Sequence, residues 1–114
     1  MILSKGPETL FKERVLKDLR ALPRTWAVKI QQVAIRGTPD ILCSMNGYFV
    51  ALELKASEKA KIDELQMYTI SMIANSNAIA LITFPANWPL TLAFLKDTCL
   101  KGIALTEEPL ITKH

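Results

Sequence analysis

With 114 residues, 50% of them hydrophobic and 22% charged, the chain has room for one compact domain spanning 1–114 and lacks the composition of a disordered or fibrous protein. Its formal net charge of +3 suits a polyanionic partner but does not establish one. Cys43 and Cys99 fit no metal-ligand spacing and no disulfide scaffold, so we expect both to be reduced and buried. No uninterrupted apolar run reaches the roughly 18 residues of a membrane span, and the first residues do not resemble a secretory leader, so we expect an intracellular protein.

The first part of the chain predicts a helix and then a strand. Pro7 suits the first position of a helix, and apolar residues recur at helical spacing until Pro23 stops it, so we expect a helix over 8–21. Apolar and polar residues then alternate, which predicts a half-buried strand over 26–33 with Trp26, Val28 and Ile30 on one face. A loop over 36–39 follows.

The most informative stretch is a pair of β-prone runs, 40–45 and 48–55, separated by Asn46-Gly47. This dipeptide favours a two-residue type I′ hairpin. Such a turn places Met45 opposite Tyr48, and counting outward along both strands places Asp40 opposite Glu53.

The second half of the chain predicts a helix over 60–75, a buried strand over 78–84 and a third helix over 88–100. In the second helix we expect an inward-facing stripe of Ile62, Leu65, Ile70 and Ile73. The complete order is αβββαβα, which gives an α/β fold with a mixed central sheet flanked by helices.

The hairpin brings charged side chains together. Directly opposed residues share a face with their Cβ atoms about 4.5 to 5.5 Å apart, so Asp40 and Glu53 would repel each other unless a cation lies between them. Lys55 projects from the same strand face as Glu53 and reaches the same volume. A solvated charge cluster at the end of a sheet is the simpler alternative.

Two carboxylates and a lysine are the groups that phosphodiester hydrolysis requires. Hard oxygen ligands hold Mg²⁺ or Mn²⁺, the metal activates water and stabilises the developing charge, and the lysine assists as a further electrophile or orients the water. The only histidine is His114, which excludes nucleases built on a central histidine base.

The chain resembles the VRR-NUC branch of the PD-(D/E)xK nucleases, which have a restriction-endonuclease-like core. The matching residues are Gly37-Thr38-Pro39-Asp40, the Asn46-Gly47 turn, Leu52-Glu53-Leu54-Lys55 and Gln66. The resemblance implies that Asp40, Glu53 and the Leu54 carbonyl bind the metal and that Lys55 is the catalytic lysine. The chain departs from the family after the second helix, where Asn75-Ser76-Asn77 replaces a glycine pair.

The same resemblance adds Glu8 as a catalytic acid and metal ligand, and Gln66 as a supporting residue of the site. Glu8 also suits the first turn of a helix without any metal, and Glu13 competes for its role. Gln66 can equally be a buried structural amide. Lys29 and Arg36 are candidate DNA-binding residues because both precede the acidic site.

We therefore expect a metal-dependent endonuclease in the cytoplasm of a bacterial or phage-infected cell. Relatives that this chain resembles act on branched DNA such as Holliday junctions, and a chain this short has little room for an element that reads base sequence. A non-catalytic DNA-binding module and a restriction-type endonuclease stay open as alternatives. We also expect a homodimer, because four-way junctions need two incisions and the apolar excess, especially over 88–100, offers an interface.

Overall fold

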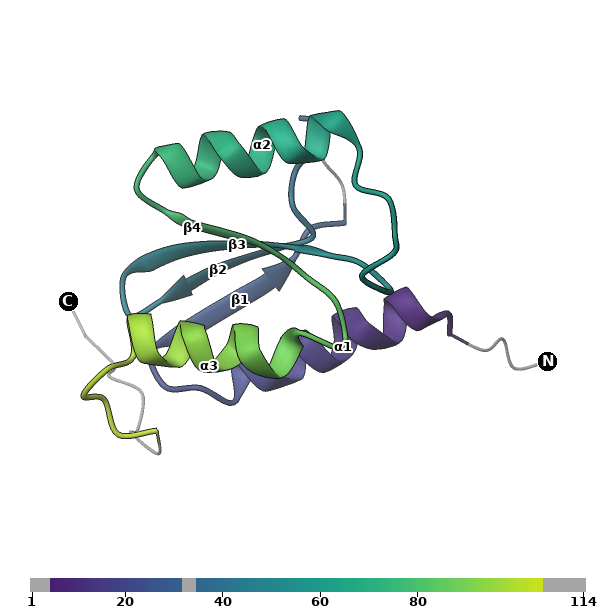
Figure 1. Cartoon of the computed structure of the whole chain (residues 1–114). Coiled ribbons are helices and arrows are strands. Elements are labelled where there is room, and N and C mark those ends of the chain that lie inside the picture. The colour runs from purple at the N-terminus through teal and green to yellow at the C-terminus, as the bar shows by residue number, and fades with distance from the viewer. Residues whose placement is uncertain (1–4, 32–34, 106–114) are drawn as a thin grey trace.

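The computed structural model describes residues 5–31 and 35–105. A sheet lies between α2 on one side and α1 with α3 on the other, so the elements form three layers (Figure 1). The order αβββαβα and the mixed sheet are as expected from the sequence. In chain order the elements are α1 (Pro7–Arg20), β1 (Thr25–Lys29), β2 (Ile41–Met45), β3 (Tyr48–Leu54), α2 (Glu64–Asn75), β4 (Ile79–Thr83) and α3 (Trp88–Cys99).

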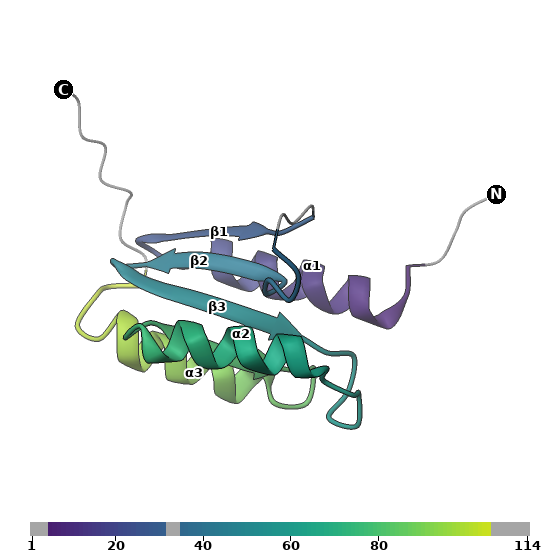
Figure 2. The same cartoon turned by 90° about the horizontal axis from the view of Figure 1, so that it is seen from above.

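The four strands lie in the order β1-β2-β3-β4, with β1, β2 and β3 antiparallel and β4 parallel to β3. The parallel pair requires a crossover, which α2 supplies. Seen from above, α2 runs along the β3–β4 half of the sheet, far from the edge strand β1 (Figure 2). One face of the β1–β2 half of the sheet is therefore not covered by α2.

The main core lies between the sheet and the pair of helices α1 and α3. Phe11 of α1 packs edge to face against Trp88 of α3, with ring centroids 6.4 Å apart. The Trp88 indole Nε1 donates a hydrogen bond to Asp18 Oδ2 over 2.8 Å, which joins the two helices a second time. Cys43 and Cys99 are buried in this core as free thiols. Within the described residues, no helix has the length and apolar character needed to cross a membrane.

The buried face of β1 is the one that carries Ala27, not the one that carries Trp26. Trp26 is 68% exposed, whereas Ala27, on the opposite face, is buried in the core. The small Ala27 side chain lies on the face against which α1 packs, and the Arg20 guanidinium donates to its carbonyl. The strand also ends at Lys29, four residues before the expected end, and Val33 lies outside the described residues.

The predicted start of α2 is also wrong. The helix begins at Glu64 because Asp63 caps it: the Asp63 side chain accepts from the Gln66 backbone and the Gln66 side chain accepts from the Asp63 backbone. Ile62 therefore lies in the preceding loop, and of the expected inward stripe only Ile70 is buried. At the far end Asn77 adopts a positive φ of 66°, the conformation that a glycine would otherwise supply.

The loop before β2 is packed tightly against α2. Gly37 has φ +83°, and a Cβ there would lie 2.8 Å from Leu65 Cγ and 2.9 Å from Thr69 Oγ1. Gly47 has a similar φ of +86°, but a Cβ there would meet nothing within 4 Å. The two glycines thus share a backbone conformation and differ in the space around them.

We expect Gly47→Ala to cost about 1 kcal/mol through backbone strain alone, and Gly37→Ala to cost about 2 to 4 kcal/mol because strain and overpacking add. Urea unfolding of both variants beside the parent protein measures the difference. Equal losses of stability would show that the loop does not pack against α2 as described.

Candidate active site

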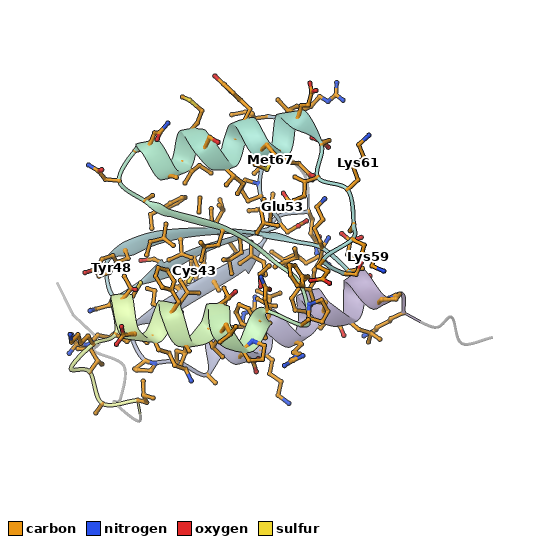
Figure 3. All side chains as sticks on the ribbon, viewed as in Figure 1. Cys43, Tyr48, Glu53, Lys59, Lys61 and Met67 are labelled. Carbon is orange, nitrogen blue, oxygen red and sulfur yellow. The ribbon has the colours of Figure 1, made fainter. Side chains whose placement is uncertain are left out.

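The β2–β3 hairpin has the register expected from its turn. Asn46 and Gly47 both have positive φ, 51° and 86°, as a type I′ turn requires. Met45 pairs with Tyr48, and Ile41 pairs with Leu52. The next position outward holds Asp40, directly before β2, and Glu53 within β3. Figure 3 shows Glu53 on the side of the sheet that α2 covers, opposite the side of Cys43.

Asp40 and Glu53 form an interacting pair at the end of the sheet. Asp40 Oδ2 accepts a hydrogen bond from the Leu54 backbone N–H over 2.8 Å. Glu53 is only 2% exposed, and within the described residues its Oε2 atom is buried without a hydrogen-bond partner. A buried acceptor left without a partner costs free energy, so this atom is destabilising unless something binds it.

The pair divides its charge unequally. Burial, reinforced by the hydrogen bond and negative charge of Asp40, raises the pKa of Glu53 to about 8. Burial alone would also raise the pKa of Asp40, but hydrogen bonds from Glu53, Leu54 and Lys12 outweigh it and lower that pKa below its usual value. At neutral pH, Glu53 is therefore mostly protonated and Asp40 is ionised, so much of the repulsion expected between two carboxylates is absent.

Lys12 supplies a cation that the sequence analysis did not assign to the site. Its Nζ atom lies 3.1 Å from Asp40 Oδ1 and 3.5 Å from Glu8 Oε1. Burial opposes its charge, but the bonds and charges of Asp40 and Glu8 prevail and raise the pKa of Lys12. Glu8 is therefore linked to Asp40 through an ammonium group. Across residues 5–31 and 35–105, no three His, Cys, Asp or Glu side chains gather closely enough to hold a metal ion.

Lys55 is hydrogen bonded to Gln66, the residue that the resemblance adds to the predicted site. The Lys55 Nζ atom donates to Gln66 Oε1 over 2.8 Å, and its backbone N–H continues the sheet by donating to Thr83. Gln66 is half-buried in the first turn of α2, where its backbone N–H also bonds the Asp63 side chain. The alternative of a fully buried structural amide does not hold.

The remaining basic candidates lie apart from the carboxylates. Arg36 lines a cavity of about 550 Å³ between the loop before β2 and the start of α2, together with Lys61 and Gln66. Lys29 is exposed at the end of the edge strand β1. Figure 3 places Lys59 and Lys61 at the same end of the molecule as Glu53. The structure thus brings four of the predicted site residues together: Asp40, Glu53, Lys55 and Gln66. Arg36 and Lys29 lie at the margin of this group.

One pattern in the sequence could have identified Lys12. Glu8 and Lys12 are four residues apart on a helix, so they lie on the same face, and Glu8 was already a candidate acid. An acid placed at the site by α1 brings its i+4 neighbour with it. The direction of that face toward Asp40 depends on how α1 packs on the sheet, which helical spacing does not determine.

Comparisons with known proteins identify the fold. A solved structure described as a VRR_NUC domain is similar to this chain with a TM-score of 0.68 and 18% sequence identity, over 82% of this chain and 98% of that one. No family model matches the sequence, and no curated protein matches it. The chain therefore has the VRR-NUC fold, at an identity of only 18% to the similar structure.

The raised pKa of Glu53 predicts how stability depends on pH. Folded Glu53 holds a proton up to about pH 8, whereas the unfolded residue loses it near its ordinary value of 4.5. Its contribution to stability is therefore complete below that ordinary value and is lost as the pH rises through about 8. Melting temperatures of the metal-free protein from about pH 5 to about pH 9 should fall for the parent and stay flatter for Glu53→Gln. Parallel curves would contradict the protonation of Glu53.

Proposed function

We propose that the protein is a metal-dependent DNA endonuclease that hydrolyses phosphodiester bonds. The observation that supports this best is the buried, unpartnered Oε2 of Glu53 beside Asp40, with Lys55 directly after the same strand. A purely structural charge cluster would satisfy its acceptors or expose them to water. This one retains an oxygen that a bound cation would satisfy.

The chemical types of the donors at the acid pair suit Mg²⁺ or Mn²⁺. Asp40 and Glu53 offer carboxylate oxygens, the resemblance adds the Leu54 carbonyl, and Glu8 can add a further oxygen from α1. Oxygen ligands without thiol or imidazole are those that hard divalent cations prefer. When bound, such a cation lowers the pKa of a water molecule and stabilises charge on the phosphate.

The other residues of the site hold Lys55 in position and supply positive charge next to the acid pair. Lys55 donates to Gln66 over 2.8 Å and lies directly after Glu53 and Leu54, where it can stabilise developing negative charge on a phosphate oxygen. The capping box of Asp63 and Gln66 fixes the first turn of α2 and therefore the lysine that bonds to it. Burial of Glu53 lowers the local dielectric, which strengthens each of these electrostatic interactions.

The proposed substrate is branched DNA such as a four-way junction. The VRR_NUC likeness supports a nucleic acid as the substrate class. Arg36 and Lys61 beside the cavity, with Lys29 at the sheet edge, supply contacts for phosphates rather than for base edges. A restriction-type enzyme would need a base-reading element, and a non-catalytic binding module would have no use for a buried acid pair.

Asp40→Asn, Glu53→Gln and Lys55→Ala should each lower the cleavage rate at least about 100-fold while the proteins stay folded, because these groups carry charge rather than packing. Cleavage of linear, flapped and four-way DNA with Mg²⁺ or Mn²⁺ measures the loss, and circular dichroism confirms the fold. Lys17→Ala, an exposed change on α1, is the matched control. Activity retained in two of the three site variants would refute the assignment.

The proposed active form is a homodimer, because one chain has one site and a four-way junction needs two incisions. The expected interface over 88–100 is wrong for most of its apolar residues: Trp88, Leu95 and Leu100 are buried in the core of their own chain, and Leu92 packs against it. Within that range, the large apolar side chains that stay exposed are Leu90 and Phe94.

Exposed apolar side chains gather instead on α2 and the sheet face beside it. Trp26 and Phe49 share that face because both pair with Ser44, and Tyr68 and Met72 are exposed on α2. None of these side chains is charged, so two copies of the surface can meet without electrostatic repulsion, as a two-fold interface requires. We define this uncharged apolar surface by these four residues.

Trp26→Glu should convert the dimer to a monomer, because it places two like charges in a two-fold interface, whereas Phe94→Glu on α3 should leave it dimeric. Light scattering at micromolar concentration, with and without a four-way junction, measures the mass. A parent protein that is only the 12.7 kDa monomer under both conditions would contradict the dimer. Dissociation by Phe94→Glu alone would instead place the interface on α3.

A further inference from the structure

Lys12 is the charged group nearest the proposed metal ligands that the proposed function does not use. Its ammonium lies between Asp40 and Glu8, at 3.1 and 3.5 Å from a carboxylate oxygen of each. The side chain is 21% exposed and that of Asp40 is 19% exposed, so the contact is partly shielded from water. An ion pair between fully exposed side chains would be screened by water and would contribute less.

Lys12 and the protein backbone contact different oxygens of the Asp40 carboxylate. Asp40 Oδ2 accepts the Leu54 N–H, whereas Oδ1 has no backbone donor within the described part of the chain and lies 3.1 Å from Lys12 Nζ. Two cations cannot share one oxygen at such distances without strong repulsion. A divalent cation bound at Oδ1 and the Lys12 ammonium therefore exclude each other.

Lys55 does not have the same role. It is the lysine that the motif identifies, but its Nζ atom is hydrogen bonded to Gln66, a neutral acceptor, rather than to a carboxylate. The two lysines thus have different partners: Lys55 is hydrogen bonded to an amide oxygen, and Lys12 forms ion pairs with two carboxylates.

We infer that Lys12 is a resident counter-ion of the metal site, which stabilises the metal-free protein and must be displaced from Asp40 before a divalent cation binds. This inference rests on the proposed function, because it takes Asp40 as a metal ligand. In the free protein, Lys12 lowers the affinity for the cation, and it keeps Glu8 and Asp40 close together until the cation arrives. Glu8 is then freed to serve as a ligand in the same exchange.

Titration of the DNA-free protein with Mn²⁺, followed by the electron paramagnetic resonance signal of the unbound ion, tests the exchange without any cleavage. Lys12→Met keeps the aliphatic stem and removes the charge, so it should bind Mn²⁺ about tenfold more tightly than the parent. Lys12→Gln is a second neutral variant and should behave in the same way. Both should also melt at a lower temperature than the parent in the absence of metal.

Two controls separate displacement from a general change of charge. Lys17→Met removes one positive charge from the same helix at an exposed position, and Lys12→Arg keeps the charge at the site. Both should bind Mn²⁺ with the affinity of the parent. Unchanged or weaker affinity in Lys12→Met and Lys12→Gln would overturn the inference, and so would equal tightening in Lys17→Met.

Failure of the inference is distinguishable from failure of the proposed function. If Asp40→Asn binds Mn²⁺ as well as the parent does, the ion does not bind at this site and the proposed function fails together with the inference. If Asp40→Asn loses binding and the parent cleaves DNA, but the Lys12 variants bind Mn²⁺ like the parent, only the counter-ion role of Lys12 is overturned.

Discussion

The register of the β2–β3 hairpin is the constraint on which the site depends. Because side chains alternate between the two faces of a strand, a slip of one residue would move Glu53 to the opposite face and bring an apolar neighbour next to Asp40. The Asn46-Gly47 turn, with both residues at positive φ, prevents that slip. A turn at one end of the hairpin thus determines the chemistry at the other end.

The acid pair lowers the stability of the fold that holds it. A leucine at position 53 would bury the same volume without a desolvated carboxyl group or an unpartnered oxygen. The protein compensates in three ways: a proton on Glu53, the Leu54 N–H on Asp40 and the Lys12 ammonium. A protein without the acid pair would need none of these three interactions. A destabilising group that is retained and compensated in this way is the pattern expected where function and stability compete.

Local patterns in the sequence predicted the element order, the hairpin and the pairing of Asp40 with Glu53, since these depend on short-range geometry. They did not predict that Ala27 rather than Trp26 faces the core, because that choice is made by α1 and follows from three-dimensional packing. The start of α2 was missed because the Asp63 capping box prevailed over an apolar pattern that continued further back. Lys12 was missed because its partner, Asp40, is 28 positions away in the sequence.

The hairpin turn is also attached to the last helix. The Asn46 side chain donates its amide N–H to the Cys99 carbonyl over 2.9 Å, across 53 residues of sequence. During synthesis on the ribosome, the hairpin emerges long before α3, so this bond can form only after nearly all of the described chain has left the exit tunnel. Contacts between distant residues close late in folding. The turn that aligns the two acids is thus secured only after α3 has been synthesised, so the geometry of the acid pair is completed by a contact made late in folding.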